Sequence, residues 1–534
     1  MNTITGAKLL INTLEKLKVR QAFGIPGIHN LDIYEALVDS SIHHVTAKNE
    51  SGAGFMADGY ARVTGMPGIA FVITGPGLTN ILTPMAQAYH DSIPMVVISS
   101  QIPTSFLNQG TGFLHELKNS TILAQSVAKE SRIVPNPESI KHYIEEAYYL
   151  SMSGNPGPVH VEIPMDILSA NVNEMDASEH IYREFKMSLD TNILDNATNV
   201  INEAKTIAII AGGGAVNAGD EVLSLSNKLS APVVHTAAGK GIVDERHPLC
   251  LGARMHCPEV KNLIKETDVV IGIGTQLSAT DLWEVPLSLD GKLIQIDIDS
   301  GQFIKNYRAD IGIKGDSKEV LQTIVPRLNK KINLGIENII SKIIKESHEN
   351  LKNLTGVFDT MDFTCEILGI IRKVIPEDGI LLTDMTTPSY ISLSEYDTYK
   401  ARTFFHPVGF GTLGYALPAG IGAKLAMPER AVCVLEGDGG FQFTMQELAV
   451  AIQQGISLPI IIWNNNGYGE IKRNQEARNF KEKIAVDHEN PDFIKLADAY
   501  GIKGFRVHNA IEMEQALKES LDEKAVSLIE VNIQ

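Results

Sequence analysis

The sequence predicts an α/β protein of three doubly wound parallel-sheet domains, and three observations support this prediction. Short apolar runs alternate with segments of helical period along the whole chain. The runs lack the regular polar alternation of a half-exposed sheet, and each is followed by Gly, Pro, Ser or Asp. Polar stretches at about 169–195 and 326–357 then divide the chain into three parts.

The elements follow from these runs in order. Nine runs are expected to be strands: 69–74, 95–99, 159–163, 207–211, 269–273, 293–298, 380–383, 432–435 and 459–463. We place the domains at 1–170, 190–330 and 358–534, which agrees with about 100–200 residues per domain. The first and third parts are similar in size and pattern, which suggests an old duplication.

Bulk composition excludes several classes of protein. The formal net charge of −18 argues against a general binder of nucleic acid or of anionic membranes. The four cysteines lie in no metal-ligand spacing, and their sparse use fits a reducing compartment. The N-terminus lacks a signal-peptide core, and no run of about 20 apolar residues occurs. We therefore expect a cytoplasmic protein with no membrane span.

Two motifs in the third part follow neighbouring strands. The run 432–435 leads into Gly437-Asp438-Gly439-Gly440, and the run 459–463 leads into 464–469, Asn-Asn-Asn-Gly-Tyr-Gly. Asn465 follows Asp438 by 27 positions, the length of one turn–helix–turn–strand excursion. Both motifs are therefore expected at the carboxyl edge of one sheet, where open α/β sheets bind ligands.

The residue types at this edge suit Mg²⁺ and a diphosphate. Mg²⁺ prefers hard oxygen ligands, and Asp438, Asn465 and the carbonyl of Gly467 would supply them. Gly439 and Gly440 leave backbone N–H groups bare at a helix start, which favours an anion. Each motif taken alone is also an ordinary strand-end turn.

The pair resembles the signature of thiamine-diphosphate-dependent enzymes, the family of acetolactate synthase, benzoylformate decarboxylase and pyruvate decarboxylase. The resemblance spans nearly the whole chain. It implies an N-terminal domain for the cofactor's pyrimidine, a central domain, and a C-terminal domain for its diphosphate. It implies thiamine diphosphate and Mg²⁺ as cofactors, with Tyr468 also among the cofactor-binding residues.

Glu50 is the predicted activating carboxylate. Residues 45–65 read VTAKNESGAGFMADGYARVTG, in which Glu50 opens a helix crowded with small residues. The segment resembles the family block in which a Glu hydrogen-bonds the pyrimidine ring, and Glu50 falls on that position. Without the resemblance, Glu50 would read as a first-turn acid that complements the helix dipole.

Gly411-Thr412-Leu413-Gly414-Tyr415 resembles the loop beneath the cofactor. The resemblance gives Leu413 the role of the apolar residue that bends the cofactor, and gives the Gly411 carbonyl a hydrogen bond from the cofactor's amino group. The alternative for Leu413 is an ordinary core leucine.

The substrate is the least determined feature. His115, in the loop NQGTGFLHEL, is our candidate proton donor, although a lone histidine is more often structural. Several segments resemble decarboxylases of larger 2-oxo acids, such as 5-guanidino-2-oxopentanoate, whose cationic tail Glu116 or Glu470 could bind. Gln101 instead matches acetolactate synthases. We predict non-oxidative decarboxylation of a 2-oxo acid, with an acetolactate synthase-type carboligase as the alternative.

Two further alternatives are a non-catalytic homologue and a flavin or nicotinamide oxidoreductase. Gly212–Gly219 departs from a dinucleotide-binding pattern at Asn217, which weakens the last of these. The resemblance also implies a site shared between subunits, so we expect a homodimer or homotetramer.

Overall fold

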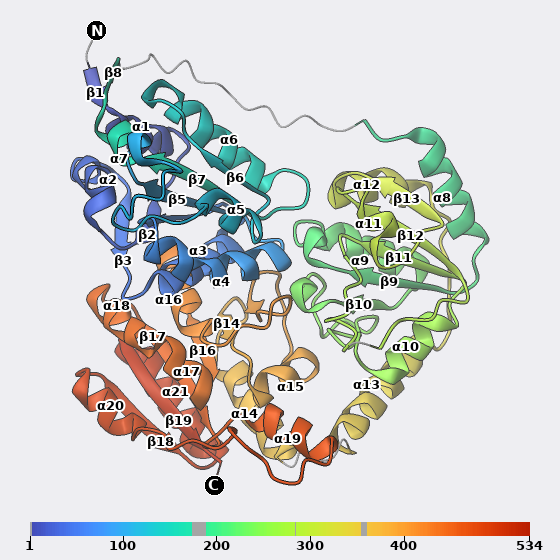
Figure 1. Ribbon diagram of the computed structural model, residues 1–534. Helices are drawn as coiled ribbons and strands as arrows, with labels where there is room; N and C mark the ends of the chain where they lie inside the picture. Colours follow the sequence, from blue (N-terminus) through green and yellow to red (C-terminus); the bar gives the residue numbers. More distant parts are fainter. Residues whose placement is uncertain (1–2, 174–187, 284, 354–359, 534) are drawn as a thin grey trace.

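The computed structural model describes residues 3–173, 188–283, 285–353 and 360–533. Its chain forms three parallel sheets, each covered by helices, which confirms the predicted fold class. Figure 1 shows the N-terminal and C-terminal domains stacked on one side and the central domain beside them. The predicted start of the third domain, residue 358, lies outside the described residues.

The N-terminal sheet has six parallel strands in the order β3-β2-β4-β5-β7-β6. In that order they are His43–Thr46, Gln21–Gly24, Gly68–Val72, Met95–Gln101, Pro158–Pro164 and Glu130–Ile133. The helices α1 to α7 are Gly6–Lys16, Leu31–Leu37, Glu50–Thr64, Pro76–His90, Ser120–Gln125, Ile140–Met152 and Met165–Ser169. A short antiparallel pair, β1 (Thr3–Thr5) with β8 (Asn171–Asn173), joins the two ends of this domain.

The central sheet has five parallel strands in the order β10-β9-β11-β12-β13. In that order they are Val233–His235, Ile207–Ala211, Val269–Ile273, Lys292–Asp297 and Ile311–Lys314. The helices α8 to α12 are Thr191–Glu203, Gly219–Leu229, Pro258–Lys265, Gln302–Lys305 and Ser317–Ile324.

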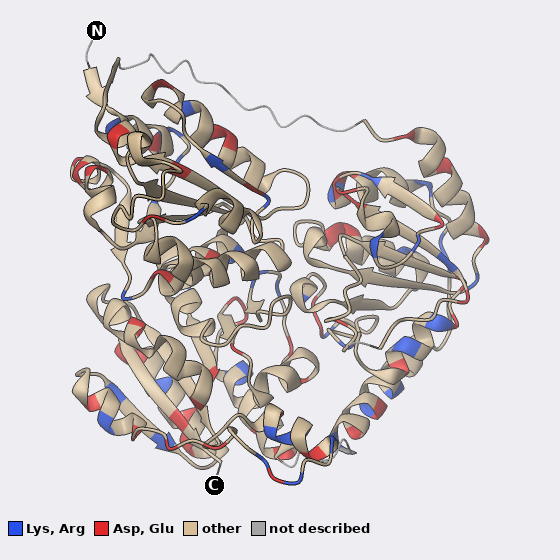
Figure 2. Cartoon of the chain, in the orientation of Figure 1, with Lys and Arg blue, Asp and Glu red and all other residues tan. Residues whose placement is uncertain are grey.

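A long helix, α13 (Ile336–Asn353), lies within the polar stretch that we used as a domain seam. Its buried face consists of Ile336, Ile340, Ile343, Ser347 and Leu351. Figure 2 colours basic and acidic residues along the same helix, and residues of both signs occur in all three domains. The charged face dominates the composition of this stretch, so composition alone indicates a polar seam although one face of the helix is apolar.

The C-terminal sheet again has six parallel strands, in the order β15-β14-β16-β17-β19-β18. In that order they are Phe404–Phe405, Ile380–Thr383, Val432–Gly437, Leu458–Asn464, Val526–Asn532 and Lys503–Val507. The helices α14 to α21 are Met361–Val374, Thr387–Glu395, Ala416–Ala426, Asp438–Thr444, Leu448–Gln453, Gly469–Ala477, Phe493–Ala499 and Ala510–Glu523.

Helix α3 of the N-terminal domain packs directly on helix α16 of the C-terminal domain (Figure 1). A Cβ atom at Gly59 would overlap the backbone of Ala419, and one at Gly422 would overlap the backbone of Met56. The two helices can therefore cross at backbone contact only because these positions are glycine. This crossing joins the two domains in one chain and fixes the helix that Glu50 begins.

Candidate functional site

Asp438, Asn465 and Gly467 meet at the carboxyl ends of β16 and β17. Asp438 is the first residue of α17, is almost fully buried, and accepts a hydrogen bond from the backbone N–H of Gly467 at 3.1 Å. β16 and β17 are parallel neighbours, so their ends share one edge of the sheet. The fold thus brings together the three residues that the motif spacing singled out.

The side-chain amide of Asn465 lies against the same cluster. One of the two terminal atoms of this amide, its oxygen or its nitrogen, lies 3.2 Å from Asp438 Oδ1 and 2.8 Å from the Gly467 carbonyl oxygen. With the amide oxygen in that position, three oxygens would face one another without a donor between them, an arrangement that a bound cation would stabilise. With the amide turned over, its nitrogen donates to both oxygens. The oxygen set is the type that Mg²⁺ prefers.

Two residues at this edge were not predicted. Asn490 Nδ2 donates to Asp438 Oδ2 at 2.6 Å, and His488 Nε2 lies 3.5 Å from the same oxygen. Both belong to a loop that returns after α19, about fifty positions beyond Asp438. That loop contains no motif, so only the folded chain reveals that these residues orient the carboxylate.

Gly439 and Gly440 leave room for other side chains. A Cβ atom at Gly439 would lie 2.7 Å from the ring of Tyr468, and one at Gly440 would lie 2.9 Å from Asp384 Oδ2. The Tyr468 ring also meets His488 edge-on, with centroids 4.8 Å apart. The glycines therefore keep the start of α17 open between a tyrosine and a buried acid.

That acid, Asp384, holds the loop predicted to lie beneath the cofactor. Its Oδ2 accepts the N–H groups of Gly414 at 2.7 Å and Tyr415 at 3.2 Å. Burial raises the pKa of the Asp384 carboxyl. Leu413, just before these residues, is only half-buried and belongs to none of the buried core clusters. This position outside the buried core clusters disfavours the core-leucine alternative.

Gly411 and Gly414 in this loop both have positive φ angles, of 66° and 77°. L-residues with a side chain rarely adopt this conformation, so the glycines allow the tight course of the loop. At the N-terminal domain's side, Gly409 N donates to Asp91 at 2.7 Å and the Tyr415 hydroxyl donates to Asp58 at 3.0 Å. Contacts from two domains thus fix both ends of the loop.

Glu50 opens α3 and has 9% of its surface exposed. Its Oε2 accepts from Asn80 Nδ2 at 2.9 Å, the one hydrogen bond to this carboxylate among the described residues. Asn49 caps the helix by accepting from Ser51 N. Glu50 Oε1 lies near Gly77, where an added Cβ atom would come within 3.4 Å of this oxygen. This environment leaves one carboxylate oxygen without a protein donor.

Glu447 of the C-terminal domain supports the start of the same helix. Its carboxylate accepts the backbone N–H groups of Lys48 at 3.1 Å and Asn49 at 3.0 Å. Burial raises the pKa of Glu447 to about 7, against these hydrogen bonds, which lower it. No hydrogen bond or ion pair connects Glu50 with the Asp438 cluster among the described residues of one chain.

His115 lies on the other side of the turn that precedes α4. It adopts a positive φ of 67°, and a Cβ at Gly75 would lie 2.7 Å from its own Cβ. Its ring stands 4.9 Å from that of His29, a buried histidine that sequence reasoning passed over. Isolated histidines carry no pattern, and 86 positions separate these two.

The remaining substrate candidates have partners within the chain. Gln101 donates to Ser120 and Glu162 at 2.6 Å each and accepts from Ile102 N at 2.8 Å. Glu116 accepts three backbone N–H groups of its own loop, and Glu470 pairs with Arg473 at 2.5 Å. These contacts give all three residues a structural role inside their segments.

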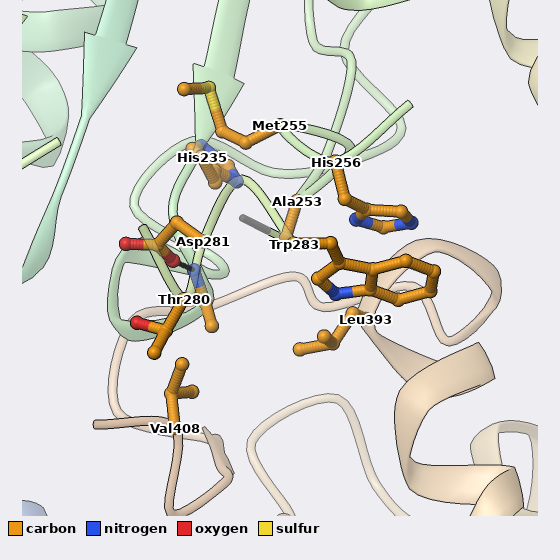
Figure 3. A pocket seen from close by; sticks show the side chains of 10 residues that line it. His235, Ala253, Met255, His256, Thr280, Asp281, Trp283, Leu393 and Val408 are labelled. Carbon is orange, nitrogen blue, oxygen red and sulfur yellow. Dashed lines mark hydrogen bonds between the residues drawn. The ribbon is translucent and has the colours of Figure 1, made fainter. Parts of the chain in front are cut away.

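A separate small pocket lies between the central domain and the third domain (Figure 3). His256 stacks on Trp283 with centroids 4.1 Å apart, and Asp281 accepts from Ala237 N at 3.0 Å. None of the predicted site residues line it. Nearby, a Cβ at Gly214 would lie 2.8 Å from Gly274, so backbone packing accounts for a glycine of the central-domain loop.

Comparison with known proteins covers the whole chain. Three thiamine pyrophosphate enzyme domains match: the N-terminal TPP binding domain at 4–122, the central domain at 194–324 and the C-terminal TPP binding domain at 386–531. The probable 2-ketoarginine decarboxylase AruI of Pseudomonas aeruginosa is 37% identical over 99% of this chain and 94% of its own length.

Acetolactate synthases are also similar. A probable acetolactate synthase large subunit of Methanococcus aeolicus is 33% identical over 97% of this chain and 90% of its own length. Acetolactate synthase isozyme 1 large subunit of Escherichia coli is 28% identical over 99% and 94%. None of the helices in the described residues is long and apolar enough to cross a membrane. The three sheets and these full-length similarities show that the chain belongs to the thiamine pyrophosphate enzyme family.

Proposed function

We propose that the protein is a thiamine-diphosphate- and Mg²⁺-dependent enzyme that decarboxylates a 2-oxo acid without oxidation. The observation that carries the proposal is the meeting of the Asp438 carboxylate, the Asn465 amide and the Gly467 carbonyl at one sheet edge. This set fits a divalent cation, and the adjacent start of α17 offers N–H groups and a helix dipole to a diphosphate. The family supplies the cofactor that joins the two.

Each remaining residue has a defined task in this proposal. When bound, thiamine diphosphate would supply a nucleophilic carbon and a cationic ring that takes up the electron pair left by loss of CO₂. Glu50 holds a proton at the pyrimidine ring, in a site where only Asn80 competes for its carboxylate. Leu413 would lie beneath the cofactor and support it, and the Gly411 carbonyl would accept a hydrogen bond from its amino group. His115 exchanges a proton with the reacting acid.

A larger 2-oxo acid such as 5-guanidino-2-oxopentanoate is the preferred substrate. The support is the 37% identity to a relative named as a probable 2-ketoarginine decarboxylase. Neither Glu116 nor Glu470 serves this proposal, since both carboxylates have partners in the chain. Recognition of a cationic tail therefore has to come from other groups.

The second candidate is an acetolactate synthase-type carboligase. Its support is the 33% identity to a probable acetolactate synthase and the match at Gln101. The Gln101 amide is held by Ser120, Glu162 and Ile102, which weakens a role for it in binding a second substrate.

A panel of 2-oxo acids separates the candidates. The protein is incubated with thiamine diphosphate, Mg²⁺ and either 5-guanidino-2-oxopentanoate or pyruvate, and CO₂, aldehyde and acetolactate are measured. We expect CO₂ and aldehyde in equal amounts, with the larger acid preferred. Acetolactate from pyruvate with little aldehyde would establish the carboligase instead, and absence of CO₂ from every acid would refute both.

We propose further that the site forms between two copies of the chain, in a homodimer or homotetramer. Large apolar side chains are exposed beside the site residues of both domains: Ile28, Leu31, Leu114, Phe410, Phe443 and Ile471. A second copy would cover them and would bring its own Glu50 to the Asp438 cluster.

Mixing two inactive variants tests this arrangement. Glu50→Gln and Asp438→Ala chains are denatured together, refolded and assayed. If each site takes one residue from each chain, half of the dimers contain one intact site, and about a quarter of the wild-type activity returns. If both residues of a site come from one chain, the mixture stays as inactive as either variant alone.

A further inference from the structure

Three helices bring a histidine, a cysteine and a glutamate together away from the Asp438 cluster and from Glu50. His348 lies on α13, Cys365 lies on α14, and Glu395 is the last residue of α15. One ring nitrogen of His348, Sγ of Cys365 and one carboxylate oxygen of Glu395 all lie within 4.8 Å of one another. Helix α13 follows the central domain, whereas α14 and α15 belong to the third domain (Figure 1).

The three donor atoms are of the types that zinc prefers. Zn²⁺ is bound by cysteine thiolate, histidine nitrogen and carboxylate oxygen, most often with four ligands in a tetrahedron. Bonds of about 2.0–2.3 Å place the ligand atoms of such a site about 3.3–3.5 Å apart. The longest of the three observed distances therefore has to shorten by less than about 1.5 Å for the side chains to enclose an ion. Mg²⁺ prefers oxygen ligands alone, so the cysteine distinguishes this set from the Asp438 cluster.

Two of the three side chains are already in contact. His348 Nδ1 and Glu395 Oε2 share a hydrogen bond at 2.9 Å, which joins α13 to α15. The other carboxylate oxygen, Oε1, accepts from Arg254 Nη2 at 3.3 Å, and Arg254 Nη1 donates to the Leu251 carbonyl at 3.0 Å. Arg254 thus orients the carboxylate and leaves Oε2 facing His348, as an outer partner of a metal ligand does. Its positive charge opposes a cation, and the negative charges of a thiolate and a carboxylate offset it.

The Cys365 thiol has no polar partner among the described residues. It belongs to no disulfide, and its side chain is half-buried against the apolar cluster that α13, α14 and α15 share. The side chains of His348 and Glu395 are 37% and 12% exposed, so an ion can reach the cluster and a water can complete a tetrahedron. Glu395 also ends α15, and the dipole at the carboxyl end of a helix favours a cation.

We propose that His348, Cys365 and Glu395 form a zinc site with water as the fourth ligand. The metal ties α13, which leaves the central domain, to α14 and α15 of the third domain. The alternative is an ordinary hydrogen bond between two helices with a cysteine packed beside it. The two differ in the bond from the thiolate to the metal, which forms as the thiol proton is released. Neither thiamine diphosphate nor a 2-oxo acid is needed to tell them apart.

Three variants each remove one ligand: Cys365→Ser, His348→Gln and Glu395→Gln. His142→Gln is the matched control, because His142 also stands on a helix near a carboxylate, that of Glu146 at 3.8 Å. The N-terminal domain, which holds this control pair, contains no cysteine. Cys365→Ser is the most informative change, since it replaces only the sulfur and leaves the hydrogen bond between His348 and Glu395 in place.

The first readout is the absorption spectrum of Co²⁺, which replaces zinc and reports its ligands. Reduced full-length protein, freed of metal with EDTA and then of EDTA, is titrated with Co²⁺ and afterwards with Zn²⁺. We expect one Co²⁺ per chain with a thiolate-to-cobalt band, displaced by Zn²⁺, and binding at least about tenfold weaker in His348→Gln and Glu395→Gln. Co²⁺ at the Asp438 cluster gives no such band, because no cysteine belongs to it. A wild type without the band, or a band that persists in Cys365→Ser, would overturn the inference.

The second readout is thermal unfolding with Mg²⁺ present throughout, so that only the effect of added Zn²⁺ is compared. We expect one equivalent of Zn²⁺ to raise the melting temperature of the wild type and of His142→Gln by about 3 °C or more, because the ion binds the folded chain. Without Zn²⁺, Cys365→Ser should melt within about 2 °C of the wild type, since the thiol has no polar partner to lose. A rise of equal size in Cys365→Ser on addition of Zn²⁺ would overturn the inference.

Discussion

The N-terminal and C-terminal sheets have the same strand order, although they perform different tasks. The orders β3-β2-β4-β5-β7-β6 and β15-β14-β16-β17-β19-β18 correspond strand by strand. This agreement supports the duplication that the sequence pattern suggested. Because the topology is shared, the two ligand-bearing edges are equivalent, and the difference between them lies in the residues at the strand ends.

The third strand of each sheet shows the difference most clearly. β16 ends in Gly437 and α17 begins with Asp438 and bare glycine N–H groups. β4 leads into a turn with Gly75 as N-cap and Pro76 at the first position of α4, where no acid occurs and one N–H is missing. The start of α17 thus offers groups suited to a cation and to an anion. The start of α4 offers neither an acid nor a full set of N–H groups.

The strands that come second along the chain in each six-stranded sheet, β3 and β15, and the helices that follow them correspond as well. α3 follows β3 and begins with Glu50, and α16 follows β15 and the Gly411–Leu413 loop. These two helices pack on each other through Gly59 and Gly422. The comparison shows that one topology can carry different residues at equivalent strand ends, which in our proposal are an acid–base group in one copy and a binding site in the other.

The largest expected effect comes from the C-terminal edge. Asp438→Ala removes the carboxylate from the cation cluster and should lower CO₂ release by about 10³-fold or more, because the cation and the diphosphate lose their shared ligand. The measurement is turnover at saturating cofactor and Mg²⁺. If Asp438→Ala kept most of its activity, the proposal that this edge of the C-terminal sheet binds the cation and the diphosphate would be wrong.

Glu50→Gln should have the next largest effect. The amide cannot hold the proton at the pyrimidine ring, so turnover should fall by about 10²–10⁴-fold. The assay is CO₂ release across the 2-oxo acid panel. Turnover equal to the wild type would remove the acid–base role from the N-terminal sheet.

Leu413→Ala should lower kcat by about tenfold, because a half-exposed side chain supports the cofactor rather than the core. The matched control is Leu417→Ala, only four residues on, where the side chain is fully buried in the core. That control should lose about 2–5 kcal/mol of stability. If both variants lost the same amount in melting temperature, Leu413 would instead be a core-packing residue.

Glu447→Gln should have the smallest effect, on the pH dependence of stability. The pKa of Glu447 is about 7 in the folded protein against 4.5 ordinarily, so the folded state binds the proton more tightly. This carboxyl therefore stabilises the fold fully below pH 4.5, and the stabilisation is lost as the pH rises to about 7. Melting temperatures measured between these pH values should fall less steeply in the variant, and an unchanged slope would contradict the assignment.

Much of the fold could be predicted because long apolar runs mark buried strands. All nine predicted runs are strands in the structure, and the bounds at 207–211, 269–273 and 380–383 agree residue for residue. The strands that were missed are short or partly polar, such as β15 with two residues and β18 with Lys503 and Arg506. Their burial depends on neighbours that a local pattern does not contain.

The candidate site divides in the same way. Asp438, Asn465 and Glu50 could be proposed as site residues because motifs and spacing surround them. Asp384, Asn490 and His29 contact the same regions through single side chains that the fold brings in from distant segments. No local sequence signal distinguishes such residues from ordinary strand-end or loop positions.

Binding of thiamine diphosphate to cofactor-free protein tests the central claim most directly. Calorimetric titrations of the wild type, Glu50→Gln and Asp438→Ala are compared with Mg²⁺ present and with the metal removed by EDTA. We expect one cofactor per chain with Mg²⁺ in the wild type and in Glu50→Gln, and no binding in Asp438→Ala or without metal. Equal binding in Asp438→Ala, or binding that ignores the metal, would contradict the account.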